Sequence, residues 1–95
     1  MSADSLSRWL ALREPADILA RSAALTKAIV ARLPPERPLR ILDLGSGTGA
    51  NVRYLSSRLP VPQQWLVVDR DADLLAEVSG QGADCRVDTE LAVCV

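Results

Sequence analysis

The segment from Arg40 to Asn51 constrains this 95-residue chain more than any other stretch. Apolar residues from Leu39 to Leu44 predict a short buried strand, and alternate glycines at positions 45, 47 and 49 predict a tight turn. A helix is then expected to begin near Ala50. A strand that runs through a glycine turn into a helix is typical of α/β units that bind nucleotides, because glycine lets a ligand approach the backbone closely.

Strand and helix patterns alternate after this turn. We expect further strands at Gln64–Asp69 and Ala83–Val87, and helices at Ala50–Arg58 and Ala72–Ser79, the latter capped by Asp71. Alternation with short connections predicts an α/β fold with a parallel sheet and right-handed crossovers. The nearly continuous apolar run of the second strand predicts that it is covered on both faces.

The first 33 residues are expected to form a helical segment, and residues 34–95 the α/β unit. One helix is predicted over residues 3–13 and another from Pro15 to Leu33, because proline suits a first helical turn and Pro34 would end the second helix. The second helix carries an apolar stripe: Ile18, Leu25, Ile29 and Leu33. Either these helices simply pack against the sheet, or one of three side chains faces a ligand: Trp9, Arg13 or Arg21.

Composition excludes several classes of protein. Apolar residues make up 48% of the chain, which is too many for a disordered segment. The net charge of −1 argues against electrostatic binding of nucleic acid. No secretory signal and no apolar run of the ~20 residues needed for a membrane span is visible, so a cytoplasmic protein is expected. Cys85 and Cys94 read as reduced residues without metal-ligand spacing, and the absence of histidine removes the commonest general base.

Acidic residues follow each predicted strand or end it. Asp43, Asp69 and Asp88 are all expected at the carboxyl edge of the sheet, where ligands bind in open α/β folds. Asp69 lies 20 residues after Gly49, a spacing at which a carboxylate can accept hydrogen bonds from both hydroxyls of a ribose. The neighbouring Arg70 would lie either over an adenine or in solvent.

Two cofactor classes fit this arrangement. Gly45, Gly47 and Ala50 satisfy the degenerate form of the dinucleotide fingerprint. The other class is S-adenosylmethionine, which has no phosphate and carries an ammonium and a sulfonium. Because Asp43 at the entrance of the turn would repel a pyrophosphate and complement those cations, it favours S-adenosylmethionine.

Residues 41–49 resemble the acid-x-Gly-x-Gly-x-Gly motif of class I S-adenosylmethionine-dependent methyltransferases, and residues 66–69 resemble the second motif of that family. The resemblance covers about residues 39–88. It implies a Rossmann-like sheet and a cofactor site in which Asp69 binds the ribose and Asp88 the adenine amino group. The site residues expected on these grounds are Asp43, Gly45, Ser46, Gly47, Thr48, Gly49, Asn51, Asp69, Arg70 and Asp88.

The chain is shorter than this family's seven-stranded fold, whose strand order is 3-2-1-4-5-7-6. It supplies only the first three strands, so we expect an incomplete domain: the cofactor-binding part of a methyltransferase, with little activity by itself. The methyl acceptor is not identifiable, and a small molecule is favoured. The first strand would have a free apolar edge through which copies could associate. The alternatives are a non-catalytic interaction module and part of an NAD(P)-binding oxidoreductase.

Overall fold

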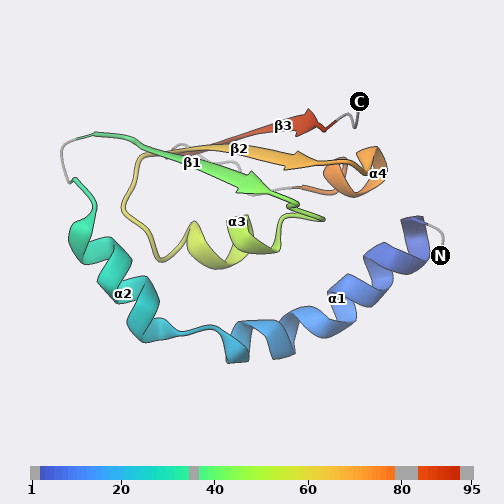
Figure 1. Ribbon diagram of the computed structural model, residues 1–95, viewed down its shortest axis with the longest axis horizontal. Coiled ribbons are helices and arrows are strands. Elements are labelled where there is room, and N and C mark those ends of the chain that lie inside the picture. The colour runs from blue at the N-terminus through green and yellow to red at the C-terminus, as the bar shows by residue number, and fades with distance from the viewer. Residues whose placement is uncertain (1–2, 35–36, 79–83, 93–95) are drawn as a thin grey trace.

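A computed structural model describes residues 3–34, 37–78 and 84–92 of the chain. Two helices precede a sheet whose strands alternate with two short helices (Figure 1). In chain order the elements are α1 (Ala3–Ala20), α2 (Ala23–Arg32), β1 (Leu39–Leu44), α3 (Ala50–Leu55), β2 (Gln63–Asp69), α4 (Ala72–Leu75) and β3 (Cys85–Leu91). None of the helices within these ranges has the length and apolarity needed to cross a membrane.

The three strands form one parallel sheet in the order β1-β2-β3. This confirms the predicted α/β fold with a parallel sheet, and the arrangement is consistent with part of a Rossmann-like domain. The register pairs Leu44 of β1 with Val68 of β2. The ends of β1 and β2 therefore lie side by side, and the glycine turn begins directly at the carboxyl edge of the sheet.

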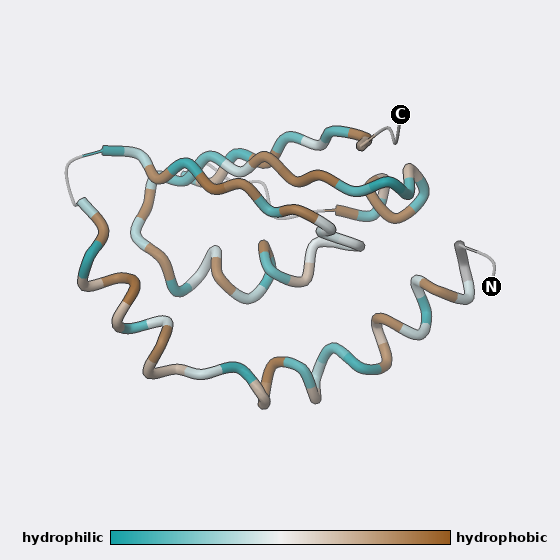
Figure 2. Tube along the Cα trace, viewed as in Figure 1, coloured by the Kyte–Doolittle hydropathy of each residue, from teal (hydrophilic) through white to brown (hydrophobic). Residues whose placement is uncertain are grey.

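The core lies between the sheet and the helices α3 and α4. Side chains that alternate along the strands point toward these helices, as the period of two requires. The buried cluster consists of Val52, Trp65, Val67, Leu75 and Val87, with Ile41, Leu55, Leu59, Val78 and Cys85 packed against it. Figure 2 shows how hydrophobic residues are concentrated along β1 and β2.

The opposite face of the sheet is open within the described residues. Leu42 and Leu44 of the edge strand β1 are 61% and 71% exposed. On β2, Gln64 is exposed, whereas Leu66 and Val68 are half-buried. The prediction that this strand is covered on both faces is therefore wrong for this structure, because α1, α2 and α3 lie on one side of the sheet (Figure 1) and α4 packs into the same core cluster as α3.

The break between the two N-terminal helices lies at Arg21–Ser22 and not at Pro15, which falls inside α1. Ser22 caps α2 by accepting a hydrogen bond from the Leu25 N–H at 3.1 Å. The Ser22 side chain satisfies one of the free N–H groups at the start of α2. Pro15 only lacks an N–H to donate within α1, and this helix continues past it with a curve (Figure 1). The predicted apolar stripe does not pack against the sheet, because Leu25 and Ile29 are exposed.

A buried glutamine fixes the connection from α3 to β2. The Gln63 side chain is fully buried, and its Nε2 donates to the carbonyl oxygens of Ser56 at 2.9 Å and Leu59 at 3.0 Å. Its Oε1 accepts from Trp65 Nε1 at 2.9 Å. One side chain therefore satisfies three partners and ties the end of the α3 segment to the sheet.

Three element ends differ from the predictions. Regular helix ends at Leu55 in α3 and at Leu75 in α4, where turns continue, and β3 runs on to Leu91. The cap of α4 is confirmed, because Asp71 Oδ1 accepts from the N–H groups of residues 73 and 74.

The thiol of Cys85 is free, and burial raises its pKa. Cys94 lies outside the described residues.

Candidate functional site

The glycine turn is held against the end of β2 by its own backbone. The N–H groups of Gly45 and Ser46 both donate to the carbonyl of Val68, at 2.8 and 3.1 Å. All three glycines of the turn have positive φ, which confirms the need for glycine there. The requirement is most severe at Gly49, where φ is +91° and an added Cβ would lie 3.2 Å from Val78 Cγ1.

Asp69 locks the middle of the turn. Its Oδ2 accepts from the Gly47 N–H at 2.8 Å, and its Oδ1 accepts from the Asp71 N–H at 2.9 Å. The carboxylate therefore joins the glycine turn to the start of the turn into α4. Since a carboxylate offers about four acceptor positions, two remain for other donors.

Asp43 lies buried at the end of β1, and one of its oxygens lacks a partner in the part of the chain that the structure describes. The residue is 8% exposed, and its Oδ1 accepts from Asn51 Nδ2 at 3.0 Å. Among the described residues, Asp43 Oδ2 has no hydrogen-bond partner, and neither does the buried hydroxyl of Ser46. Buried polar atoms without partners are costly, so these two atoms mark a place where a polar ligand or water completes the structure.

Helix α1 crosses in front of the turn and encloses a cavity of about 250 Å³. The turn contributes residues 45–48 to its lining, and the start of α3 contributes residues 50 and 51. The helical segment contributes Leu10, Glu14, Asp17 and Arg21. The Leu10 side chain also lies 3.7 Å from the position that a Cβ on Gly47 would take, so the helix packs closely on the turn.

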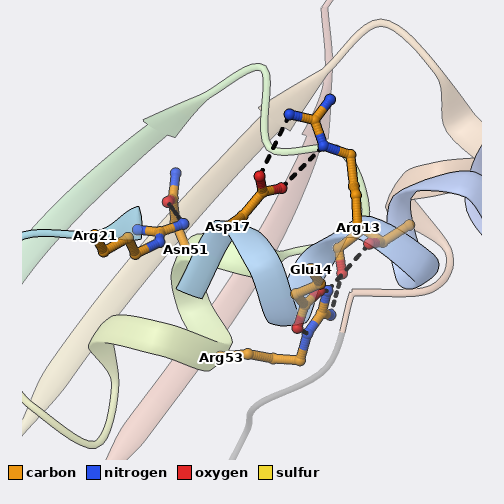
Figure 3. Close-up of polar contacts among 7 residues, drawn as sticks. Arg13, Glu14, Asp17, Arg21, Asn51 and Arg53 are labelled. Carbon is orange, nitrogen blue, oxygen red and sulfur yellow. Dashed lines mark hydrogen bonds and ion pairs between the residues drawn. The ribbon is translucent and has the colours of Figure 1, made fainter. Parts of the chain in front are cut away.

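Arg53 of α3 joins α1 to the turn. Its Nε donates to Glu14 Oε2 at 3.0 Å, and its Nη2 donates to the other oxygen of the same carboxylate (Figure 3). The guanidinium also donates to the carbonyl and the hydroxyl of Thr48, at 2.6 and 3.1 Å. Hydrogen bonding to Arg53 lowers the pKa of Glu14, and the same pair raises the pKa of Arg53.

Two arginines of the N-terminal helical segment also have defined partners (Figure 3). Arg13 pairs with Asp17 one helical turn on, with an Nε–Oδ2 distance of 3.0 Å, and lies over the ring of Trp9. Arg21 Nη2 donates to Asn51 Oδ1 at 2.6 Å, and its guanidinium lies 4.5 Å from the ring centre of Tyr54. Of the three side chains named as ligand-facing candidates, Arg21 is the one that lines the cavity.

Asp88 does not join this site, which corrects the sequence-based expectation. The register places it opposite Leu66 in the middle of β3, three residues before the level of Asp69. At a rise of about 3.3 Å per residue it lies about 10 Å short of the carboxyl edge. It is exposed on the open face and pairs there with Arg86 at 3.1 Å. The expectation was wrong because the third strand was predicted to end at Val87, whereas β3 continues to Leu91.

The remaining expected residues surround the turn. Thr48 and Asn51 line the cavity, and Arg70 is exposed. Sequence reasoning missed Glu14, Asp17 and Arg53. Glu14 and Arg53 are 39 positions apart in sequence, so no local pattern could reveal their pairing. A larger hollow of about 530 Å³ lies across the three strands and contains Asp88, but no buried polar side chain without a partner lines it.

Comparison with known proteins gives a partial match to a methyltransferase. The chain is similar to the release factor glutamine methyltransferases of Escherichia coli (strain K12) and Shigella flexneri, each 44% identical over 71 residues. The aligned region covers 70% of this chain and 25% of each relative, so the chain spans about a quarter of the length of these relatives. No protein-family model matches the sequence. At a coarse level, this similarity supports a relationship to the methyltransferases.

Proposed function

We propose that this chain is the S-adenosylmethionine-binding part of a methyltransferase of class I. The observation that carries the proposal is the buried Asp43 carboxylate beside the glycine turn, with Oδ2 lacking a partner among the described residues. A group with a positive charge and N–H donors suits that oxygen. The ammonium of the methionine moiety is such a group.

The backbone of the turn argues against a dinucleotide. A pyrophosphate is held by free N–H groups of a glycine turn and of the helix that follows. Here Gly45 and Ser46 donate to Val68, Gly47 donates to Asp69, and Gly49 donates to the carbonyl of Ser46. Four N–H groups of the turn are therefore already satisfied by the protein, and Asp43 would repel a phosphate.

The residues have separate roles in the proposed site. Asp43 and the Ser46 hydroxyl would receive the amino group, and the two free acceptor positions of Asp69 would receive the ribose hydroxyls. The cavity of about 250 Å³ is smaller than the roughly 300–1,000 Å³ of complete ligand pockets. It therefore suits the amino-acid end of the cofactor, and the adenosine end would extend past Asp69.

When bound, S-adenosylmethionine would supply an activated methyl group on a sulfonium. The described residues would hold and orient that group, because methyl transfer depends mainly on keeping donor and acceptor in line. We assign no general base and no acceptor. Because the chain spans about a quarter of its relatives, we expect cofactor binding and little methyl transfer from these residues alone.

Calorimetric titration of the folded chain with S-adenosylhomocysteine and with NADH tests the proposal. We expect S-adenosylhomocysteine to bind more tightly, and tighter binding of NADH would overturn the assignment. Asp43→Asn should weaken S-adenosylhomocysteine at least tenfold, since a hydrogen bond to a charged group contributes about 1.5–3 kcal/mol. Asp88→Asn is the matched control, because that carboxylate is exposed on the open face and should leave the affinity unchanged.

A non-catalytic interaction module is the competing function. It predicts neither heat nor a shift in melting temperature when a folded sample is mixed with millimolar S-adenosylhomocysteine. The exposed leucines of β1 make this alternative worth testing, because an open apolar face suits a partner surface.

A further inference from the structure

Arg21 occupies the junction between α1 and α2, and its side chain lines the cavity beside the glycine turn. Its backbone N–H donates to the carbonyl of Ile18, and the Ser22 cap begins α2 at the next residue. Its guanidinium is fixed from two sides, by Asn51 Oδ1 and by the ring of the buried Tyr54. The side chain is thus oriented before any ligand arrives.

Among the described residues, the two acidic side chains that line the cavity each form a salt bridge with another arginine, whereas Arg21 acts on Glu14 only through its charge, which helps to lower the pKa of that carboxylate. Glu14 has both oxygens on Arg53, and Asp17 has both oxygens on Arg13. The described hydrogen bond of Arg21 goes to a neutral amide, which uses one of the five donors of a guanidinium. Within the part of the chain that the structure describes, the lining therefore offers one cation with donors to spare.

Asn51 connects this cation to the buried anion of the site. Its Oδ1 accepts from Arg21, and its Nδ2 donates to Asp43 Oδ1. A guanidinium that lines the cavity and a buried carboxylate thus lie on opposite sides of one amide, and that amide itself lines the cavity. An α-amino acid carries the complementary pair of charges on neighbouring atoms, an ammonium and a carboxylate.

We infer that Arg21 binds the carboxylate of the methionine moiety of S-adenosylmethionine, while Asp43 receives its ammonium. This inference rests on the proposed function and assigns the N-terminal helical segment a direct part in cofactor binding. The planar fork of arginine suits a carboxylate because it can donate two parallel hydrogen bonds.

The test compares S-adenosylhomocysteine with 5′-(3-aminopropylthio)-5′-deoxyadenosine, which keeps the amino group and lacks only the carboxylate. Affinities of the full chain for both ligands are measured by calorimetry. The unsubstituted protein should bind S-adenosylhomocysteine at least tenfold more tightly than the analogue. In Arg21→Met this ratio should fall to near one, with the affinity for the analogue unchanged. Arg21→Lys, which keeps the charge without the fork, should give an intermediate ratio.

Arg13→Met is the matched control, because it removes another guanidinium of the N-terminal helical segment, one that already has Asp17 as its partner. The ratio should stay at its original value there. Equal weakening of both ligands in Arg21→Met would overturn the inference and make Arg21 a positioning residue acting through Asn51. If Arg21→Met fails to fold, as judged by circular dichroism, an unchanged ratio in Arg21→Lys overturns it. Absence of S-adenosylhomocysteine binding by the original chain would instead refute the proposed function.

Discussion

Gly49 offers the sharpest test of how the glycine turn is built. Its φ of +91° lies in the left-handed region, and an added Cβ would lie 3.2 Å from Val78 Cγ1. The left-handed conformation costs a residue with a Cβ about 1–2 kcal/mol. Pushing Val78 aside should cost about 1 kcal/mol more, at the low end for overpacking. We therefore expect Gly49→Ala to lower the free energy of unfolding by about 2–3 kcal/mol.

Gly45→Ala is the matched control. Its φ is +69°, but nothing lies within 4 Å of the added Cβ, so only the backbone strain of about 1–2 kcal/mol applies. Both substitutions stiffen the unfolded chain in the same way, so that contribution cancels when the two variants are compared. The difference between them isolates the contact with Val78.

Urea unfolding followed by the fluorescence of the buried Trp65 measures these energies. In a domain of this size each 1 kcal/mol should shift the melting temperature by roughly 4–8 °C. Val78→Ala completes a double-mutant cycle, in which the extra cost of Gly49→Ala over Gly45→Ala should disappear. Equal costs of the two glycine substitutions in the original background would refute the reasoning.

Three further predictions concern other parts of the molecule. Gln63→Leu should lower the free energy of unfolding by at least about 2 kcal/mol in urea titrations, because two carbonyls and the Trp65 N–H lose their buried partner. An unchanged free energy of unfolding would mean that water replaces the amide as that partner. The pKa of Glu14 is lowered in the folded state by Arg53, so its stabilisation is present above the ordinary pKa of 4.5 and is lost as the pH falls through the lower folded pKa. Acid titration followed by circular dichroism should show this loss, and Glu14→Gln should remove it. Leu44→Lys, on the exposed edge strand, should reduce any self-association seen by light scattering without lowering the melting temperature, and unchanged association would exclude this strand as the contact.

Local sequence patterns predicted those parts of the site that depend on neighbouring residues. The tight turn formed by the glycines, the end of β1 near Asp43 and the cap at Asp71 each follow from residues within a few positions. The place of Asp88 did not follow, because the length of β3 depends on its pairing with β2 and not on its own residues. The start of α2 was misplaced for a different reason. Pro15 and Ser22 are both residues that suit a helix start, and the sequence alone did not show that the helix begins after Ser22.

The sequence by itself determined a strand, a glycine turn and an acid at the end of the next strand, because backbone geometry and hydrophobic period act over short distances. The tertiary structure decided what surrounds that turn. It brought Glu14 to Arg53 and Arg21 to Asn51 across 39 and 30 positions, and it left Asp43 Oδ2 buried without a partner among the described residues. Such contacts depend on how α1 packs over the turn, and no residue pattern within either segment specifies that packing.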